Sequence, residues 1–180
     1  MEKGPDSAWK LAGLGAMGPD PVVKDKLMLF GQFVGEWDII EGKYLDEAGQ
    51  WVNQTGEVHW NWILDGKALQ DVWMYHDRES GRLSPAGTTL RFYDSKKGFW
   101  VSIWVSPLRS DVGVFHGRKE GEEIVLELQD YSKEEAEGEV RWIFSEITPQ
   151  SFRWRGEESQ DEGKTWILKQ ALSIVRKGYP

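Results

Sequence analysis

Residues 88–130 decide the fold class; they read TTLRFYDSKKGFWVSIWVSPLRSDVGVFHGRKEGEEIVLELQD. The segment consists of short runs rich in β-branched and aromatic residues, and the breaks between them end in Gly98 or Gly121 or contain Pro107. Runs of this length and composition, bounded by turn-forming residues, predict β-strands. We expect four strands here, at 88–95, 98–106, 112–119 and 122–130.

The same pattern continues on both sides of this segment. Further strands are expected at 35–45, 51–64, 67–77, 138–147, 151–158 and 164–176. The turn signals recur every 8–12 residues with no long helix between them, which predicts an antiparallel meander. A sheet of about ten strands curls, and closing it removes its exposed edges. The sequence therefore predicts an all-β barrel of about 8–10 strands.

The N-terminal region differs from the rest of the chain. Residues 1–20 read as an irregular arm because Gly4-Pro5 and Gly18-Pro19 interrupt any helical period, although Trp9 gives the arm some apolar character. The arm could be a disordered tail, a strap across a cavity mouth or a contact with a sister subunit. Residues 21–180 then form one barrel domain. It opens with a short helix from about Pro21 to Phe33 that plugs one end of the barrel.

Composition excludes several classes of function. The chain has 180 residues and a formal charge of 22 − 30 = −8, so nucleic acid and anionic membrane surfaces are poor partners. It contains no cysteine, which excludes thiol nucleophiles, disulfides and Fe–S clusters. No apolar run approaches the ~20 residues of a spanning helix, and the first residues lack the order of a signal peptide. We expect a cytoplasmic protein.

The excess of aromatic residues is the main functional signal. Eleven Trp, seven Phe and five Tyr predict either tightly filled strands or an aromatic-lined cavity. Alternation places Phe152 and Trp154 on the inner face of their strand. In 98–106 both faces are apolar, one carrying Trp100 and Trp104 and the other Ile103, so either could face the lumen.

Five segments also carry a resemblance to a known family: FVGEW at 33–37, LDGKAL at 64–69, LRFYD at 90–94, WVSIWV at 100–105 and SQDEGKTW at 159–166. Together they resemble small bacterial lipocalin-like (calycin) proteins of mostly uncharacterised function, over about 33–176. The resemblance implies a meandering barrel with an end-plugging helix and a cavity. The last segment also matches the Asp-box turn of β-propellers. Because it occurs once, we interpret it as a structural hairpin.

Polar residues among aromatic ones are the candidate site. Asp71 and His116 are the candidates for proton transfer, and Arg91 would neutralise a carboxylate or pair with Glu146. The candidate ligand-binding residues are Arg91, Trp60, Trp62, Trp73, Tyr75, Trp104, Trp142, Glu146 and Trp154. The three histidines lack metal-site spacing, so we expect no metal and no cofactor.

Three hypotheses for function follow from these features. The first is binding of a small apolar or aromatic molecule in a Trp-rich cavity. The second is a cofactor-free cyclase, isomerase or lyase that acts on such a molecule by general acid/base catalysis. The third is a structural module that forms a homodimer or larger homo-oligomer through aromatic residues on its outer face.

Overall fold

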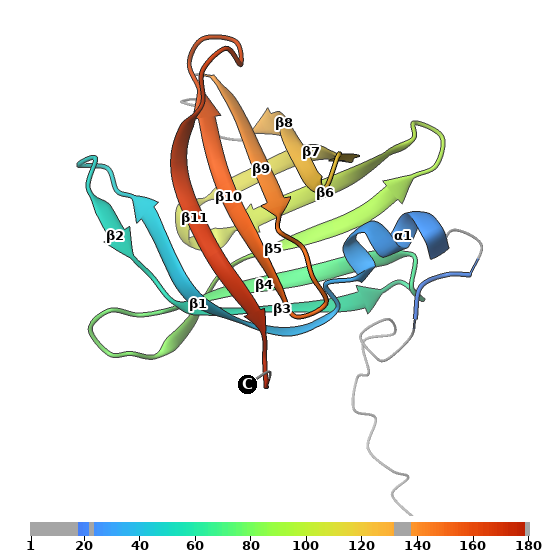
Figure 1. Ribbon diagram of the computed structural model, residues 1–180, viewed down its shortest axis with the longest axis horizontal. Helices are drawn as coiled ribbons and strands as arrows, with labels where there is room; N and C mark the ends of the chain where they lie inside the picture. The colour runs from blue at the N-terminus through green and yellow to red at the C-terminus, as the bar shows by residue number, and fades with distance from the viewer. Residues whose placement is uncertain (1–17, 22–23, 132–137, 179–180) are drawn as a thin grey trace, which may run out of the picture.

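The strands expected from the sequence form one antiparallel sheet that closes on itself (Figure 1). The computed structural model describes residues 18–21, 24–131 and 138–178. Its elements are α1 (Lys24–Gly31), β1 (Gly35–Leu45), β2 (Trp51–Asn53), β3 (Gly56–Ile63), β4 (Ala68–His76), β5 (Leu83–Asp94), β6 (Phe99–Ser106), the 3-10 turn η1 (Pro107–Arg109), β7 (Asp111–Glu120), β8 (Glu123–Tyr131), β9 (Glu139–Ser145), β10 (Ser151–Ser159) and β11 (Ile167–Arg176). The all-β class, the meander and the short N-terminal helix are confirmed. Most of the arm, residues 1–17, lies outside the described residues.

Closure depends on β1, which pairs with β11 from Trp37 opposite Arg176 to Tyr44 opposite Gln170. The first half of β1 also pairs with β3, and its last residues pair with β2. A bulge between Ile39 and Glu41 separates these two halves, and bulges bend a strand. The barrel therefore has ten strands, with β2 as an extension on β1. The expected single strand at 51–64 is corrected to two strands, β2 and β3.

Helix α1 fills one end of the barrel. Phe30 is 0% exposed and contacts Trp60, Trp100 and Phe144, with ring centroids 6.3, 4.9 and 5.8 Å away. The plug, as we call Leu27, Phe30 and Phe33, belongs to the main core cluster. A Cβ on Gly31 would lie 2.6 Å from the ring of Trp62, so this close approach of helix to strand needs glycine.

Glycines opposite tryptophans show which face of β6 points inward. Trp100 lies opposite Gly117 and Trp104 opposite Gly113 on β7. A Cβ on Gly87 would also lie 2.3 Å from the Trp104 ring. These glycines leave room for the two indoles, so the face with Trp100 and Trp104 lines the lumen and the face with Ile103 lies outside.

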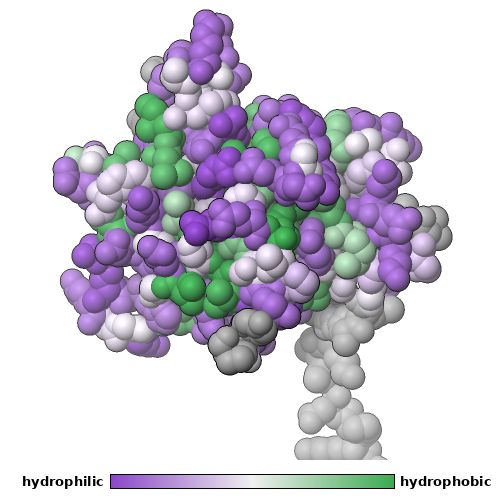
Figure 2. All heavy atoms as spheres, in the orientation of Figure 1, coloured by the Kyte–Doolittle hydropathy of each residue, from purple (hydrophilic) through white to green (hydrophobic). Residues whose placement is uncertain are grey.

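Most tryptophans of the described residues are buried or half-buried. Trp51, 46% exposed, is the one tryptophan in the described ranges whose side chain is exposed. The surface in Figure 2 is mostly hydrophilic, with separate apolar patches. The interior thus accounts for most of the tryptophans in the described ranges.

Replacing Phe30 by alanine tests the plug. Phe30→Ala should lower the free energy of unfolding by about 3–5 kcal/mol, because a fully buried ring leaves a cavity among other rings. Urea unfolding measures this. Met28→Ala is the control on the same helix, since Met28 is 38% exposed, and it should change stability by less than about 0.5 kcal/mol. Equal effects of the two substitutions would show that α1 does not plug the barrel.

Candidate functional site

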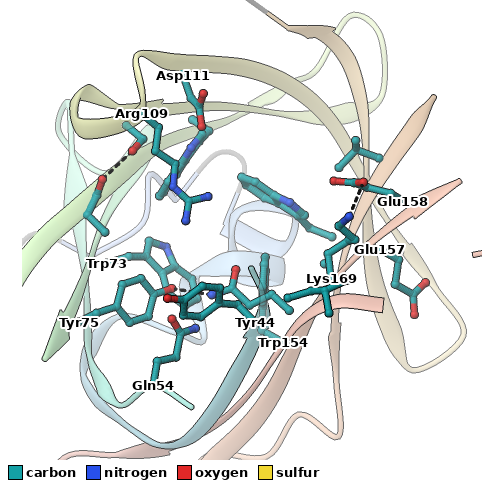
Figure 3. Close-up of a pocket in the computed structure, with 18 of the residues that line it drawn as sticks. Tyr44, Gln54, Trp73, Tyr75, Arg109, Asp111, Trp154, Glu157, Glu158 and Lys169 are labelled. Carbon is teal, nitrogen blue, oxygen red and sulfur yellow. Dashed lines mark hydrogen bonds and ion pairs between the residues drawn. The ribbon is translucent and has the colours of Figure 1, made fainter. Parts of the chain in front are cut away.

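The half of the barrel that the plug leaves free contains a cavity of about 1010 Å³. Turns at the barrel end away from α1 border it, including Asp77–Glu79 and Arg109–Asp111. Its wall combines polar side chains, such as Gln54, His76 and Lys169, with seven aromatic ones: Tyr44, Trp73, Tyr75, Trp104, Phe115, Trp142 and Trp154. Figure 3 shows Trp73, Tyr75 and Trp154 around this space.

The aromatic side chains hold one another in place. Trp142 stacks on Phe115 with ring centroids 3.9 Å apart. It meets Trp104 and Trp154 edge to face at 5.7 Å each, and Trp154 reaches Trp73 at 5.8 Å. Such pairs each contribute about 0.5–1.5 kcal/mol beyond the area they bury. The result is a connected cluster of aromatic rings on the cavity wall, suited to a flat ring.

An ion pair forms the floor of the cavity. Arg91 on β5 and Asp71 on β4 are 1% and 0% exposed, and Arg91 Nη1 contacts Asp71 Oδ2. The backbone N–H of Thr89 donates to Asp71 Oδ1 at 3.1 Å. Arg91 lines the cavity, whereas Asp71 lies behind it. The arginine is therefore presented to the cavity with its charge compensated from behind.

The other side of Arg91 faces the plug. Its guanidinium carbon lies 4.5 Å from the ring centroid of Trp60, 5.2 Å from that of Phe30 and 5.9 Å from that of Phe144. Ring faces attract a cation at these distances. Burial lowers the pKa of Arg91, because an apolar environment disfavours the charged form. The Asp71 carboxylate and the rings offset that cost.

Several polar atoms near the floor have no hydrogen-bond partner in the described structure. They are Nε of Arg91, Oγ1 of Thr89, Oγ of Ser102 and Nε1 of Trp60. All four side chains are at most 1% exposed. Unpaired buried donors are costly, at roughly 1–3 kcal/mol each, so the floor has unused hydrogen-bonding capacity.

Tyr75 adds a polar group to the wall. Its hydroxyl accepts a hydrogen bond from the Gln170 side-chain amide at 3.2 Å, and the dashed line in Figure 3 marks this contact. Burial raises the pKa of Tyr75 to about 12, while the Gln170 hydrogen bond and the charge of Arg109 lower it. Tyr75 is therefore neutral at physiological pH.

The mouth carries charges of both signs. Lys169 pairs with Glu158 at 3.2 Å, and Arg141 and Arg155 hold Glu157 at 2.7 and 3.0 Å. Figure 3 shows the Arg109 side chain reaching over the cavity. Glu157, Glu158 and Lys169 are thus matched locally.

The structure brings six of the expected ligand-binding side chains together at the cavity: Arg91, Trp73, Tyr75, Trp104, Trp142 and Trp154. Trp60 and Trp62 are interior, but they pack in the core against α1 rather than lining the cavity. Asp71 is interior as well, and its carboxylate is engaged by Arg91 and by the Thr89 backbone.

Two expected orientations are corrected. His116 was expected to face the lumen, but its ring lies 4.0 Å from that of Phe99, and the next residue toward the N-terminus, Phe115, lines the cavity instead. Burial and the charge of Lys97 lower the pKa of His116. Gly113 and Gly117, also on β7, lie opposite Trp104 and Trp100. The face of β7 that carries these glycines is therefore the inner one.

Glu146 is the second corrected residue. It was placed with Trp142 and Phe144 by alternation, but β9 ends at Ser145 and Glu146 has a left-handed φ of 49°. Its side chain is 68% exposed and pairs with Arg153 at 2.8 Å. The anticipated Arg91–Glu146 pair is therefore wrong, and Asp71 is the partner of Arg91.

Sequence reasoning missed Phe115, Tyr44 and Arg109. The alternation that placed His116 inside excluded Phe115, although the flanking glycines indicate the opposite face. Tyr44 lies on β1 beyond the bulge, which shifts its register relative to β11. Arg109 is the last residue of the 3-10 turn η1, where the two-residue alternation of strands does not predict which way a side chain points.

The 159–166 turn is structural, as expected. Asp161 accepts hydrogen bonds from the Thr165 backbone and hydroxyl at 2.8 and 2.7 Å, and Trp166 Nε1 donates to the Gly163 carbonyl at 3.0 Å. These hydrogen bonds to Asp161 lower its pKa. The motif closes the β10–β11 hairpin beside the mouth.

Comparison with known proteins supports the architecture. No family model and no curated protein matches the chain. The crystal structure of Rv2717c from M. tuberculosis matches 88% of this chain and 99% of its own, with 14% identity and a TM-score of 0.60. The S-type phycobiliprotein lyase CPES from Guillardia theta matches 85% of this chain and 93% of its own, with 13% identity and a TM-score of 0.56. Both are barrels of the lipocalin-like kind, so the expected resemblance holds at the level of the fold.

No helix in the described ranges is both long and apolar enough to cross a membrane. Within those same ranges, no group of three His, Asp or Glu side chains is placed to hold a metal ion.

A double-mutant cycle tests the floor. Arg91→Met should lower the free energy of unfolding by about 3–5 kcal/mol, because it leaves the buried Asp71 carboxylate without a partner. Asp71→Leu combined with Arg91→Met should be more stable than Arg91→Met alone, since no buried charge remains. Urea unfolding of the wild type, both single variants and the double variant measures the coupling.

The exposed Arg153–Glu146 pair is the control for this cycle. Its side chains are 60% and 68% exposed, so Arg153→Met should cost at most about 1 kcal/mol. Additive effects of Asp71→Leu and Arg91→Met would contradict the assignment of a coupled buried pair.

Proposed function

We propose that the protein binds a small, flat, largely apolar or aromatic molecule in the barrel cavity. The observation that carries this proposal is the aromatic wall above a polar floor, in a cavity of about 1010 Å³. Small-molecule sites are typically apolar clefts of roughly 300–1,000 Å³ with a few convergent polar groups. The cavity is at the upper end of that range, so it suits a multi-ring molecule better than a single small ring.

Because the rings border an open cavity, ligand binding explains them better than packing of the barrel interior alone. The wall rings Trp73, Trp104, Trp142 and Trp154 all border the cavity. Each buried Å² of apolar ligand surface contributes about 25 cal/mol, which supplies the driving force for binding. Arg91 and Tyr75 then orient the ligand through hydrogen bonds.

The geometry favours binding over acid/base catalysis. Asp71 is separated from the cavity by Arg91, and His116 faces away from it. The hydroxyl of Tyr75, with its pKa raised to about 12, is a poor base at neutral pH. At the floor a ligand therefore meets the Arg91 guanidinium and ring faces, whereas the lining carboxylates Glu157 and Glu158 are held in ion pairs at the mouth. The cytoplasmic location and the homodimer stay predictions from the sequence.

Ligand binding is tested by intrinsic tryptophan fluorescence and native mass spectrometry. The probes are planar aromatic ketones and acids, together with a linear tetrapyrrole because one structural neighbour is named a phycobiliprotein lyase. We expect saturable quenching and a 1:1 complex with at least one probe. Trp142→Ala should then weaken binding about tenfold, equivalent to roughly 1.4 kcal/mol, because the ligand loses a wall ring and the Phe115 stack.

Trp51→Ala is the matched control. Trp51 is exposed on β2 and does not border the cavity, so its loss should leave affinity unchanged. If no probe binds, or if Trp51→Ala weakens binding as much as Trp142→Ala, the cavity is not the binding site.

A further inference from the structure

The floor of the cavity determines which chemical group of a ligand can point inward. Arg91 is the charged residue at the floor, and a free arginine would favour a carboxylate. Asp71 directly behind it changes that preference, because the pair as a whole is neutral. A carboxylate entering here would bring a second negative charge next to a buried one.

The floor nevertheless offers donors. Nε of Arg91 has no hydrogen-bond partner in the described structure, and the hydroxyls of Thr89 and Ser102 beside it have none either. Ser102 lies directly opposite Arg91 in the β5–β6 register, and Thr89 is two residues from Arg91 on the same face of β5. Of these three residues Arg91 borders the cavity, whereas Thr89 and Ser102 do not, so the Arg91 guanidinium is the donor that a ligand can meet.

We propose that the cavity selects ligands whose inner end is a neutral hydrogen-bond acceptor, an aromatic ketone, quinone or lactam carbonyl, and disfavours the corresponding carboxylates. The proposal rests on ligand binding in the cavity as proposed above and adds its chemical class. The carbonyl oxygen accepts from the Arg91 guanidinium without adding charge. The ring of the ligand lies against Trp142 and the rings around it, and the pair of Arg91 and Asp71 stays intact.

The Thr89 contact makes a clean test of charge possible. Asp71 Oδ1 accepts from the Thr89 backbone N–H at 3.1 Å, and the amide oxygen of asparagine can accept the same bond. Asp71→Asn therefore keeps the shape and this hydrogen bond while it removes the negative charge. The floor of that variant carries one net positive charge.

The probes are 2-acetylnaphthalene and 2-naphthoate, which share a ring system and differ in a neutral or anionic end. Dissociation constants come from tryptophan fluorescence and calorimetry at pH 7. Wild-type protein should bind the ketone about tenfold more tightly than the carboxylate. Asp71→Asn should raise carboxylate affinity about tenfold and so cancel or reverse the preference. Glu146→Gln is the control, since it removes the same charge from the exposed outer surface and should leave the ratio of affinities unchanged.

The possible outcomes separate this inference from the proposed function. Equal affinities, or tighter binding of the carboxylate by wild-type protein, would overturn the inference while leaving the cavity as a binding site. Binding of neither probe, nor of any other in the panel, would overturn the proposed function and the inference with it. The wild-type comparison decides the matter even where Asp71→Asn does not fold, and thermal unfolding of the variant shows whether it does.

Discussion

The contact between Arg91 and Asp71 is the constraint on which the interior depends. Both groups are withdrawn from water, and neither could be there alone, because an unpaired buried charge costs several kcal/mol. The pair fixes what lies around it. On one side the guanidinium meets the rings of Phe30, Trp60 and Phe144, and on the other it borders the cavity. The boundary between the packed and the open half of the barrel is therefore set by one arginine.

That division follows from the width of the barrel. About eight strands give an interior that side chains can fill, and more strands widen it. Ten strands close here, so side chains from the wall alone leave space, and α1 supplies rings that fill one end. Because α1 has eight residues and buries one side of itself, it reaches only part of the lumen. The remaining space is lined by rings that support one another, such as Trp142 on Phe115, and it stays open at the far end.

Much of this arrangement was predictable from local patterns. Turn glycines and β-branched runs placed most strand ends to within three residues, although β5 begins at Leu83, five residues before the expected 88. Alternation placed Phe152 and Trp154 inside, where the structure has them. Two of the failures have one cause, which is that a two-residue period is lost at a backbone irregularity. Glu146 is itself left-handed just past a strand end, and Tyr44 follows a bulge. The partner of Arg91 was missed because cross-strand register, with Asp71 diagonal to Arg91, depends on how two hairpins align.

A buried ion pair is a poor way to stabilise a barrel, since an apolar pair of similar volume often gives equal or greater stability. Core packing alone therefore does not explain Arg91 at this position. Its guanidinium supplies what an apolar side chain cannot, namely donors at the bottom of an aromatic cavity, and Asp71 supplies a countercharge without occupying the cavity. Arg91 borders the cavity, so its guanidinium is the group of the pair that a ligand can meet, whereas Ser102 is fully buried and does not border the cavity. The ion pair stabilises the barrel no more than an apolar pair would, so its contribution to the binding surface best explains its presence.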